Sequence, residues 1–430
     1  MRSIELLSEP VIAGIAAGEV AERPASVVKE LVENSLDAGA VRVTVEYDDA
    51  DGGRIVVTDD GHGIAGDELE LAIRPHATSK IRDLSDLDGV CSFGFRGEAL
   101  ASIGAVSKLE LVSRRRLDEA GAVIRVEGGN VVDVGAVGAR PGTRVTVSDL
   151  FGSVPARRKF LKSASAEYSL AADNLRRIAL ANPGVHLRLL RNGRAAFDFG
   201  PVENLAGRLR QVYGRELATA MVEIEARHAG LVLTGSLSPA GVSFGSAKRL
   251  SLFVNGRWVH DRALFRALME AYRTYLVRNR YPAAVLFLEV APDRVDVNVH
   301  PAKAEVRFDD AELVQRFVIE SVRDLLRGSA SPLGRWGLSA DDMERLSRNV
   351  PGERRRDAPA ARSRSDGRGV PREPSSTHAR PATGEEDAEL PGYRPTAVED
   401  AGERCAEEQS TLPLDADPTA ELPDVLGQVF

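Results

Sequence analysis

RPASVVKELVENSLDAGA, residues 23–40, predicts an amphipathic helix that begins at Pro24 and ends before Gly39. Its apolar residues recur at helical spacing and predict a buried stripe: Val27, Val28, Leu31, Val32 and Leu36. Polar residues at spacing i, i+3, i+4 and i+7 share a second face: Glu30, Glu33, Asn34 and Asp37. Surface helices usually place a cation four residues after an acid, but here Glu30 is followed by Asn34 and Glu33 by Asp37. We therefore expect part of this face to bind a ligand, and Glu33 and Asp37 to face solvent in support.

The composition predicts a soluble chain with more than one core. A length of 430 residues is enough for two or three domains, and 43% of the residues are hydrophobic. The two cysteines, Cys91 and Cys405, lie far apart and match neither a disulfide framework nor a zinc ribbon. The sequence shows no secretory signal and no apolar run of the roughly 18 residues that a membrane span needs. We expect a cytoplasmic protein with no membrane partner.

The pattern of predicted elements changes three times along the chain. Residues 1–204 alternate helical and strand patterns, and the same kind of pattern restarts over residues 205–328. Residues 1–328 carry 43 Lys and Arg against 44 Asp and Glu, whereas residues 329–430 carry 13 against 20. From about residue 351 the composition shifts to Pro, Arg, Ser, Asp and Glu, and we expect an acidic disordered linker over residues 329–423. Apolar sequence returns at residues 424–430.

The strands of the first segment are predicted to form hairpins. VRVTVEY (residues 41–47) and RIVVTDD (residues 54–60) read as strands joined by a turn-rich connection. Strand pairs with short connections imply a mixed or mostly antiparallel sheet, with helices on one face. The fold class expected from the residues is therefore α+β.

Three glycine-rich or polar loops are candidates for binding phosphate. GHGIAG, residues 61–66, matches G-x-G-x-x-G, but Asp59 and Asp60 precede it where dinucleotide sites carry apolar residues, which disfavours a Rossmann fold. No P-loop motif occurs in the sequence. GFRGEAL, residues 94–100, places Arg96 and two glycines at a helix start, as anion sites do. HATSK, residues 76–80, is typical of a lid over phosphate, although each loop alone also fits a polar surface.

Seven motifs in this order resemble the MutL family of DNA mismatch repair proteins, a branch of the GHKL ATPases: ENSLDAG, DDGHGI, HATSKI, GFRGEALASI, PGTRV, VPARRKFL and DVNVHPAKAEVRF. E-x-x-x-N and D-x-G-x-G are shared by all GHKL ATPases, whereas GFRGEALASI and NVHPAK are narrower. The resemblance implies a GHKL (Bergerat-type) ATP-binding α/β sandwich with a mixed sheet in residues 1–204. It implies a smaller, ribosomal-S5-like transducer domain in residues 205–328. It also implies that residues 424–430 begin a truncated C-terminal dimerisation domain.

The resemblance implies an ATP site that uses Mg²⁺. Glu30 is the expected general base for the water that attacks the γ-phosphate, and Asn34 is the expected Mg²⁺ ligand. Asp59 is expected to accept a hydrogen bond from the adenine amino group, with Thr143 in support. The other expected ATP-binding residues belong to the close-approach glycines, the lid and the phosphate cradle: Gly61, Gly63, His76, Ala77, Thr78, Ser79, Lys80, Gly94, Phe95, Arg96, Gly97 and Glu98.

Lys303 resembles a lysine of the second domain that reaches across to the γ-phosphate. Such a phosphate sensor would make the domain geometry depend on the nucleotide. On the residues alone, Lys303 and Glu305 also fit the solvent side of an alternating strand.

Basic residues mark a candidate DNA surface. PARRKFLK places Arg157, Arg158 and Lys159 in one short segment. Clusters of this kind contact phosphate backbones, although many are only solvated faces. Arg262 falls where the family has a DNA-contacting arginine. No base-reading motif appears, so we expect binding to double- and single-stranded DNA that does not depend on sequence.

The resemblance implies a homodimer that ATP binding closes on DNA and hydrolysis resets. The implied partners are the mismatch-recognition protein MutS, a downstream incision endonuclease and a helicase, at the nucleoid. Two alternatives stay open: another GHKL ATPase such as a topoisomerase ATPase subunit, or a scaffold that binds ATP without hydrolysing it. No D-Q-H-A-x-x-E-x-x-x-x-E endonuclease motif occurs in these residues, which leaves nicking activity undecided.

Overall fold

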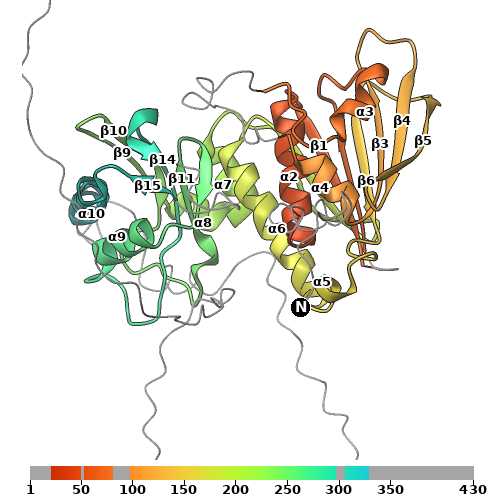
Figure 1. The fold of residues 1–430 in the computed structure, drawn as a ribbon. Coiled ribbons are helices and arrows are strands. Elements are labelled where there is room, and N and C mark those ends of the chain that lie inside the picture. The colour runs from red at the N-terminus through yellow and green to blue at the C-terminus, as the bar shows by residue number, and fades with distance from the viewer. Residues whose placement is uncertain (1–20, 50–52, 81–96, 297–305, 329–430) are drawn as a thin grey trace, which may run out of the picture. The chain divides into compact units, whose positions relative to one another are not determined.

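The computed structural model describes residues 21–49, 53–80, 97–296 and 306–328 (Figure 1). Contacts divide the chain into two units, Met1–Arg356 and Asp357–Phe430, and every described residue belongs to the first. Several predictions lie outside the described residues: those for Gly94, Phe95, Arg96, Lys303 and Glu305, and for the segments 329–423 and 424–430.

The helix predicted from the opening stretch is confirmed. Helix α2 spans Pro24–Asp37, with Pro24 in its first turn and Arg23 extended before it. The predicted stripe is buried at Val27, Val28, Leu31 and Val32, and half-buried at Leu36. The apolar spacing therefore predicted both the helix and the face that it buries.

Eight strands form the first sheet, in the order β5-β4-β3-β6-β2-β1-β7-β8. They are β1 (Arg42–Asp48), β2 (Arg54–Asp59), β3 (Lys108–Arg114), β4 (Gly121–Glu127), β5 (Asn130–Val137), β6 (Gly142–Ser148), β7 (His186–Arg191) and β8 (Arg194–Phe199). Strands β1 and β7 are parallel, and the other neighbouring pairs are antiparallel. This confirms the predicted mixed sheet, including the hairpin of β1 and β2.

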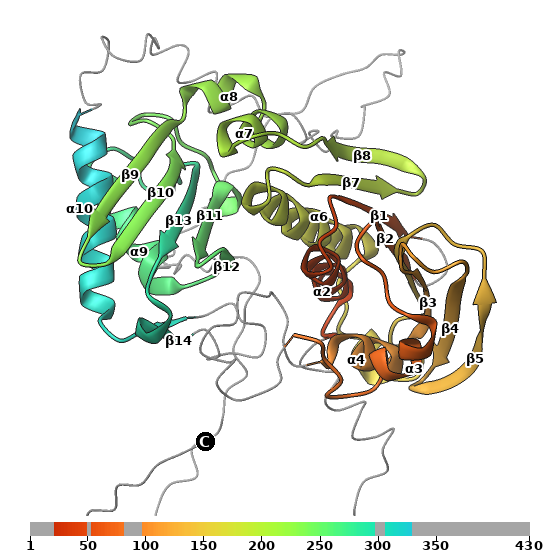
Figure 2. The ribbon, with the colours of Figure 1, turned by 90° about the horizontal axis from the view of Figure 1, so that it is seen from above.

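Helices cover one face of this sheet, as Figure 2 shows. They are α2, α4 (Ala99–Ala105) and α6 (Ala164–Ala181), and short helical turns lie nearby: η1 (Gly66–Glu68), α3 (Leu69–Ala72) and α5 (Pro155–Arg158). One hydrophobic core joins Val28 and Leu31 of α2 to Leu175 of α6 and to Val45 and Leu111 of the strands. The rigid sheet thus supports α2 from its apolar side and leaves its polar face for the site.

Strand β5 was not predicted from the sequence. It lies at an edge of the sheet and pairs with β4 alone. Val131, Val132 and Val134 are 44–56% exposed. A strand with two exposed faces needs no alternation of apolar and polar residues, so the usual period-two signal is missing.

A second sheet of five strands follows, in the order β12-β11-β13-β10-β9. Its strands are β9 (Val222–His228), β10 (Leu231–Leu237), β11 (Leu250–Val254), β12 (Arg257–Val259) and β13 (Ala284–Glu289). The surrounding elements are α7 (Leu205–Tyr213), α8 (Arg215–Ala220), η3 (Ala247–Arg249), α9 (Arg262–Tyr272), η4 (Pro292–Arg294), the pair β14 (Val295–Asp296) and β15 (Arg307–Phe308), and α10 (Ala311–Gly328). The edge strand β9 was not among the predicted strands.

Alternation along the central strands buries both faces of the second sheet. Phe253 and Val285 belong to a core that contains Leu209 of α7 and Leu217 of α8. The next residues along the strands, Val254 and Leu286, belong to a core with Leu268 of α9 and Val322 of α10. Within the part of the chain that the structure describes, no helix is long and apolar enough to cross a membrane.

A fully buried arginine ties the end of α6 to the start of α7. The Arg208 side chain donates hydrogen bonds to the carbonyl oxygens of Pro183 (2.8 Å) and Val185 (2.6 Å), and to Gln211 (2.6 Å). Burial lowers the pKa of Arg208. Both carbonyl acceptors lie just beyond α6, so Arg208 satisfies backbone oxygens of the connection between α6 and β7.

Candidate functional site

A cavity of about 990 Å³ brings together residues from segments that are far apart in the sequence. Its lining includes most of the predicted site residues: Glu30, Asn34, Asp59, Gly63, His76, Ala77, Thr78, Ser79, Lys80, Gly97, Glu98 and Thr143. These residues come from the polar face of α2, the loop after β2, the loop after α3, the start of α4 and the start of β6. Gly61 is not part of this lining, and its backbone N–H donates to Oδ1 of Asp59.

Asp59 is a half-buried acid of the cavity lining. Its Oδ1 accepts hydrogen bonds from the backbone N–H groups of Gly61 (2.9 Å) and Thr143 (3.2 Å). Its Oδ2 accepts one from the hydroxyl of Ser35 (2.8 Å). Burial raises the pKa of Asp59 above its ordinary value of 3.8, although these three hydrogen bonds act in the opposite direction. The carboxylate is therefore fixed in position, and Oδ2 has lone-pair capacity for a further donor.

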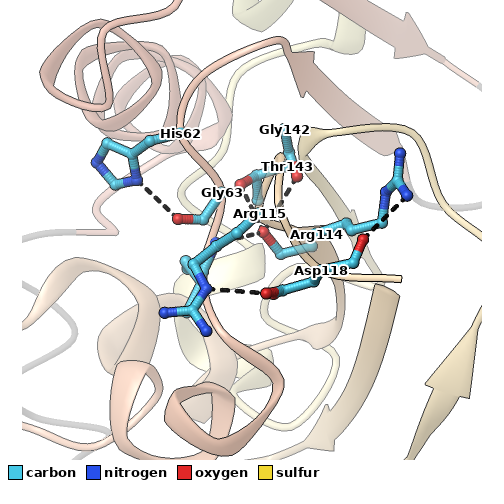
Figure 3. Close-up of polar contacts among 9 residues, drawn as sticks. His62, Gly63, Arg114, Arg115, Asp118, Gly142 and Thr143 are labelled. Carbon is cyan, nitrogen blue, oxygen red and sulfur yellow. Dashed lines mark hydrogen bonds and ion pairs between the residues drawn. The ribbon is translucent and has the colours of Figure 1, made fainter. Parts of the chain in front are cut away.

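The protein atoms around position 63 leave room only for a glycine. It has a φ of 75°, and a Cβ there would lie 2.2 Å from the carbonyl oxygen of Arg114. Close by, the Ser113 hydroxyl accepts from the N–H of Ile64 (2.8 Å) and bonds to the Thr143 hydroxyl (2.9 Å), within the network drawn in Figure 3. These contacts hold the D-x-G-x-G loop on β3 and β6. The sequence had predicted only that the glycines let the backbone pass close to the nucleotide.

The polar face of α2 is neutralised by lysines, which corrects the expectation for Glu33 and Asp37. Glu33 is only 9% exposed and lies 3.5 Å from the Lys29 ammonium, which is also 3.7 Å from Glu30. Burial opposes the charged form of Lys29, but Glu33 and Glu30 outweigh it and raise the pKa of Lys29 above 10.5. Both acids therefore lie beside a cation within the cavity wall.

Asp37 is buried as well, with a side chain 8% exposed. The Lys80 ammonium donates hydrogen bonds to Oδ2 of Asp37 (2.6 Å) and to Oδ1 of Asn34 (3.0 Å). The predicted solvent-facing role of Glu33 and Asp37 is wrong, because the fold brings a second cation to this end of the helix. The amide and carboxylate oxygens beside Lys80 are also of the type that Mg²⁺ prefers, so the residues present fit a cation here.

The loops at the mouth of the cavity contact each other. Nδ1 of His76 lies 3.3 Å from Oε1 of Glu98. Gly97 has a φ of 65°, and a Cβ there would lie 2.5 Å from the carbonyl oxygen of Ala77. HATSK and GFRGEAL, identified separately in the sequence, thus meet in space.

Three residues of the site escaped the sequence analysis. Ser35 holds Asp59, Lys29 neutralises Glu30 and Glu33, and Trp258 of β12 lines the cavity. The guanidinium of Arg177 stacks over the Trp258 ring, 4.2 Å from its centroid. The ion pair of Lys29 with Glu33 could have been predicted from the sequence, because Lys29 lies four residues before Glu33. Trp258 carries no motif, and only the fold places it here.

The candidate DNA residues lie outside the cavity lining. Arg157 and Arg158 are in α5, Lys159 follows it, and Arg262 begins α9. Arg158 forms an ion pair with Asp149 (3.6 Å), and Lys159 and Arg262 are exposed. Their role in DNA binding stays a prediction.

Two protein-family models match the chain. One, described as histidine kinase-, DNA gyrase B- and HSP90-like ATPase, matches residues 22–128. The other, described as DNA mismatch repair protein, C-terminal domain, matches residues 209–327. The first match contains α2 and the loops around the cavity, and the second contains all five strands of the second sheet.

Curated relatives and solved structures agree with these models. The chain is 47% identical to the DNA mismatch repair protein MutL of Xylella fastidiosa (strain 9a5c) over 334 residues, which are 77% of the chain but 54% of that relative. It therefore spans about half the length of such relatives. The Aquifex aeolicus MutL ATPase domain complexed with ADP is 30% identical, with a TM-score of 0.51, and the match covers 70% of the chain and 98% of that domain. The N-terminal domain of a DNA repair protein shares the fold at 24% identity, with a TM-score of 0.66 and coverage of 75% of the chain and all of that domain.

The geometry around Asp59 predicts that Asp59→Asn keeps the fold and stabilises it at neutral pH. The Asn oxygen can accept from both backbone N–H groups, and its NH₂ can donate to Ser35, whose hydroxyl also donates to Leu31. Because burial raises the pKa of Asp59, the ionised carboxylate costs stability above that pKa. The cost disappears below 3.8, where the folded and unfolded states are both protonated.

Urea unfolding at several pH values from 8 downward measures this effect. The free energy of unfolding of Asp59→Asn should exceed that of the wild type at pH 8, and the difference should shrink as the pH falls. A variant that is less stable than the wild type at pH 8 would contradict this account of the carboxylate.

Proposed function

Because the chain belongs to the MutL family of DNA mismatch repair proteins and carries a GHKL-type ATPase domain, we propose that it hydrolyses Mg²⁺-bound ATP in this cavity during mismatch repair. One observation carries the proposal. Glu30 and Asn34, one turn apart on α2, line the same cavity as Asp59 and Thr143. A base and a metal ligand are thus at one end and an adenine acceptor is at the other.

At the adenine end, the half-buried carboxylate of Asp59 selects the base. The adenine amino group donates to Oδ2 of Asp59, whose Oδ1 is already used by Gly61 and Thr143. A purine with an oxygen in place of the amino group would place two acceptors together. Buried polar groups that lose their partner discriminate strongly, so the site prefers adenine to guanine.

At the phosphate end, Glu30 accepts the proton of the water that attacks the γ-phosphate, and Lys29 forms an ion pair with this carboxylate. Asn34 offers its amide oxygen to Mg²⁺, which when bound neutralises charge on the phosphate oxygens. Phosphoryl transfer needs positioned groups and no covalent intermediate. The residues at this end supply that positioning.

The mouth of the cavity supplies the phosphate contacts. Thr78 and Ser79 offer hydroxyls, Lys80 an ammonium, and the residues around Gly97 offer backbone N–H groups at the start of α4. His76 contacts Glu98 at this mouth, with Nδ1 3.3 Å from Oε1. Gly94, Phe95, Arg96 and the sensor Lys303 belong to the same proposal.

The proposed cycle couples nucleotide to DNA and partners. ATP binding closes two copies of the chain into a clamp on DNA, and hydrolysis resets it. Arg157, Arg158, Lys159 and Arg262 contact DNA phosphates without reading sequence. The clamp connects mismatch recognition by MutS to strand incision by an endonuclease and to unwinding by a helicase, in the cytoplasm at the nucleoid.

We expect Glu30→Ala to bind ATP nearly as well as the wild type but to hydrolyse it ~10²–10⁴-fold more slowly, the usual contribution of a general base. Phosphate release and binding of a labelled ATP analogue measure the two effects. Glu68→Ala is the matched control, since Glu68 is an exposed acid of the same cavity. Normal turnover in Glu30→Ala would remove Glu30 from the role of base.

Asn34→Ala should lose the part of ATP affinity that depends on Mg²⁺. Titrations of the nucleotide with Mg²⁺ and with a chelator separate that part from the rest. Asn174→Ala removes another amide that lines the cavity, one that donates to the carbonyl of Ala25, and should keep the Mg²⁺ effect. If Mg²⁺ strengthens ATP binding equally in Asn34→Ala and the wild type, Asn34 is not the metal ligand.

For Arg262→Glu we predict weaker DNA binding with an unchanged fold. The slope of log affinity against log salt should fall by about 1 for each lost phosphate contact. Arg316→Glu, the same charge change at an exposed position of α10, is the control. Identical salt dependence in Arg262→Glu and the wild type would exclude Arg262 from the DNA surface.

A further inference from the structure

The basic segment 155–162, which connects β6 to α6 (Figure 1), exposes an aromatic ring. Phe160 is 86% exposed. Among the residues that the structure describes, no other phenylalanine, tyrosine or tryptophan is exposed. A large aromatic side chain left in water forgoes the stability that its burial would provide, so this position calls for a functional explanation.

The fold anchors this connection by its other large apolar residues. Phe151 is fully buried although its φ is 63°, and its N–H donates a hydrogen bond to the carbonyl of Val106 (2.7 Å). Val154 and Leu161 are half-buried and pack against the core of the first sheet. The core thus takes the apolar residues on both sides, whereas the ring of Phe160 lies in solvent.

The charges around Phe160 have one sign. Residues 155–162 contain four cations and no acid. Lys159 and Lys162 are both exposed, and no carboxylate of the described residues forms an ion pair with either of them. Surfaces that bind single-stranded nucleic acid combine the same two features, cations for the phosphates and an aromatic ring for the bases.

We propose that Phe160 is a base-stacking residue for single-stranded DNA: its ring stacks on an unpaired base, and Lys159 and Lys162 contact the flanking phosphates. This rests on the proposed function, which assigns this segment to phosphate contacts alone. In a duplex each base is covered by its neighbours, so an external ring reaches no free base face. Phe160 therefore makes the segment favour single strands over duplexes.

A protein partner fits this surface less well. The buried centre of a protein interface is formed by several apolar residues and is depleted of charge. Here Phe160 is the one large apolar side chain of residues 149–162 that is exposed, and exposed cations lie on both sides of it in the sequence. The composition of the surface matches a polyanion with flat, uncharged bases.

Fluorescence anisotropy tests the stacking with three labelled ligands of one length: single-stranded oligothymidine, its duplex, and a single strand of stable abasic residues. We expect Phe160→Ala to bind oligothymidine about tenfold more weakly than the wild type, a usual loss for one stacked aromatic ring. Binding to the duplex and to the abasic strand should change little, because neither offers a free base. Phe160→Tyr keeps the ring and should bind as the wild type does.

Two further variants separate stacking from charge and from exposed apolar surface in general. Lys159→Gln should lower the salt slope of single-strand binding by about 0.7, whereas Phe160→Ala should leave the slope unchanged, since a ring releases no counterions. Leu117→Ala removes a side chain that is 95% exposed outside the segment, and should bind all three ligands as the wild type does. Circular dichroism checks that each variant is folded.

Equal affinity of folded Phe160→Ala and the wild type for oligothymidine would overturn the proposal. If Lys159→Gln still lowers the salt slope in that case, the DNA surface of the proposed function stands without the stacking. An equal loss on oligothymidine and on the abasic strand would also contradict it, because the base would then not matter. A change in the association of two copies with unchanged DNA binding would assign Phe160 to a protein interface instead. A wild type that binds none of the ligands would remove the proposed DNA contacts together with the stacking.

Discussion

The balance of charge on the polar face of α2 is the constraint on which the site depends. Three carboxylates and an amide lie along this face, and two of the carboxylates, Glu33 and Asp37, are buried. Lys29 contacts Glu30 and Glu33 at one end of the face, and Lys80 donates a hydrogen bond to Asp37 at the other. A highly charged anion can bind beside these carboxylates only if it brings a cation of its own or pairs with a cation that is already present. Mg²⁺-bound ATP meets this requirement, because it brings both charges together.

In the function that we propose, the two ends of the cavity select the nucleotide by different physical means. The half-buried carboxylate of Asp59 is held by three donors, so its selectivity would come from the direction of one further hydrogen bond. At the proposed phosphate end, Lys29 and Lys80 come from separate segments, so selectivity there would come from charge. The sheet joins the two ends rigidly, since Asp59 ends β2, Thr143 lies in β6, and α2 packs on the same sheet.

Local patterns predicted the elements that position the site, and tertiary contacts decided the rest. Helix α2 and the hairpin of β1 and β2 could be predicted from the sequence, because each of them buries one face and so shows a regular apolar spacing. Strand β5 was missed because both of its faces are exposed. Glu33 and Asp37 were predicted to face solvent because no cation stands four residues after either acid. Lys29 precedes Glu33, and Lys80 arrives from a distant loop. Trp258 reaches the cavity from the second sheet and carries no sequence signal of doing so.

The most direct test of the account is phosphate release from ATP by this chain, measured with Mg²⁺ and with a chelator. The account predicts hydrolysis that requires Mg²⁺ and that a non-hydrolysable ATP analogue inhibits by competition. ATP bound in the cavity without phosphate release in Mg²⁺ would contradict the assignment of Glu30 and Asn34. The chain would then be a nucleotide-binding scaffold.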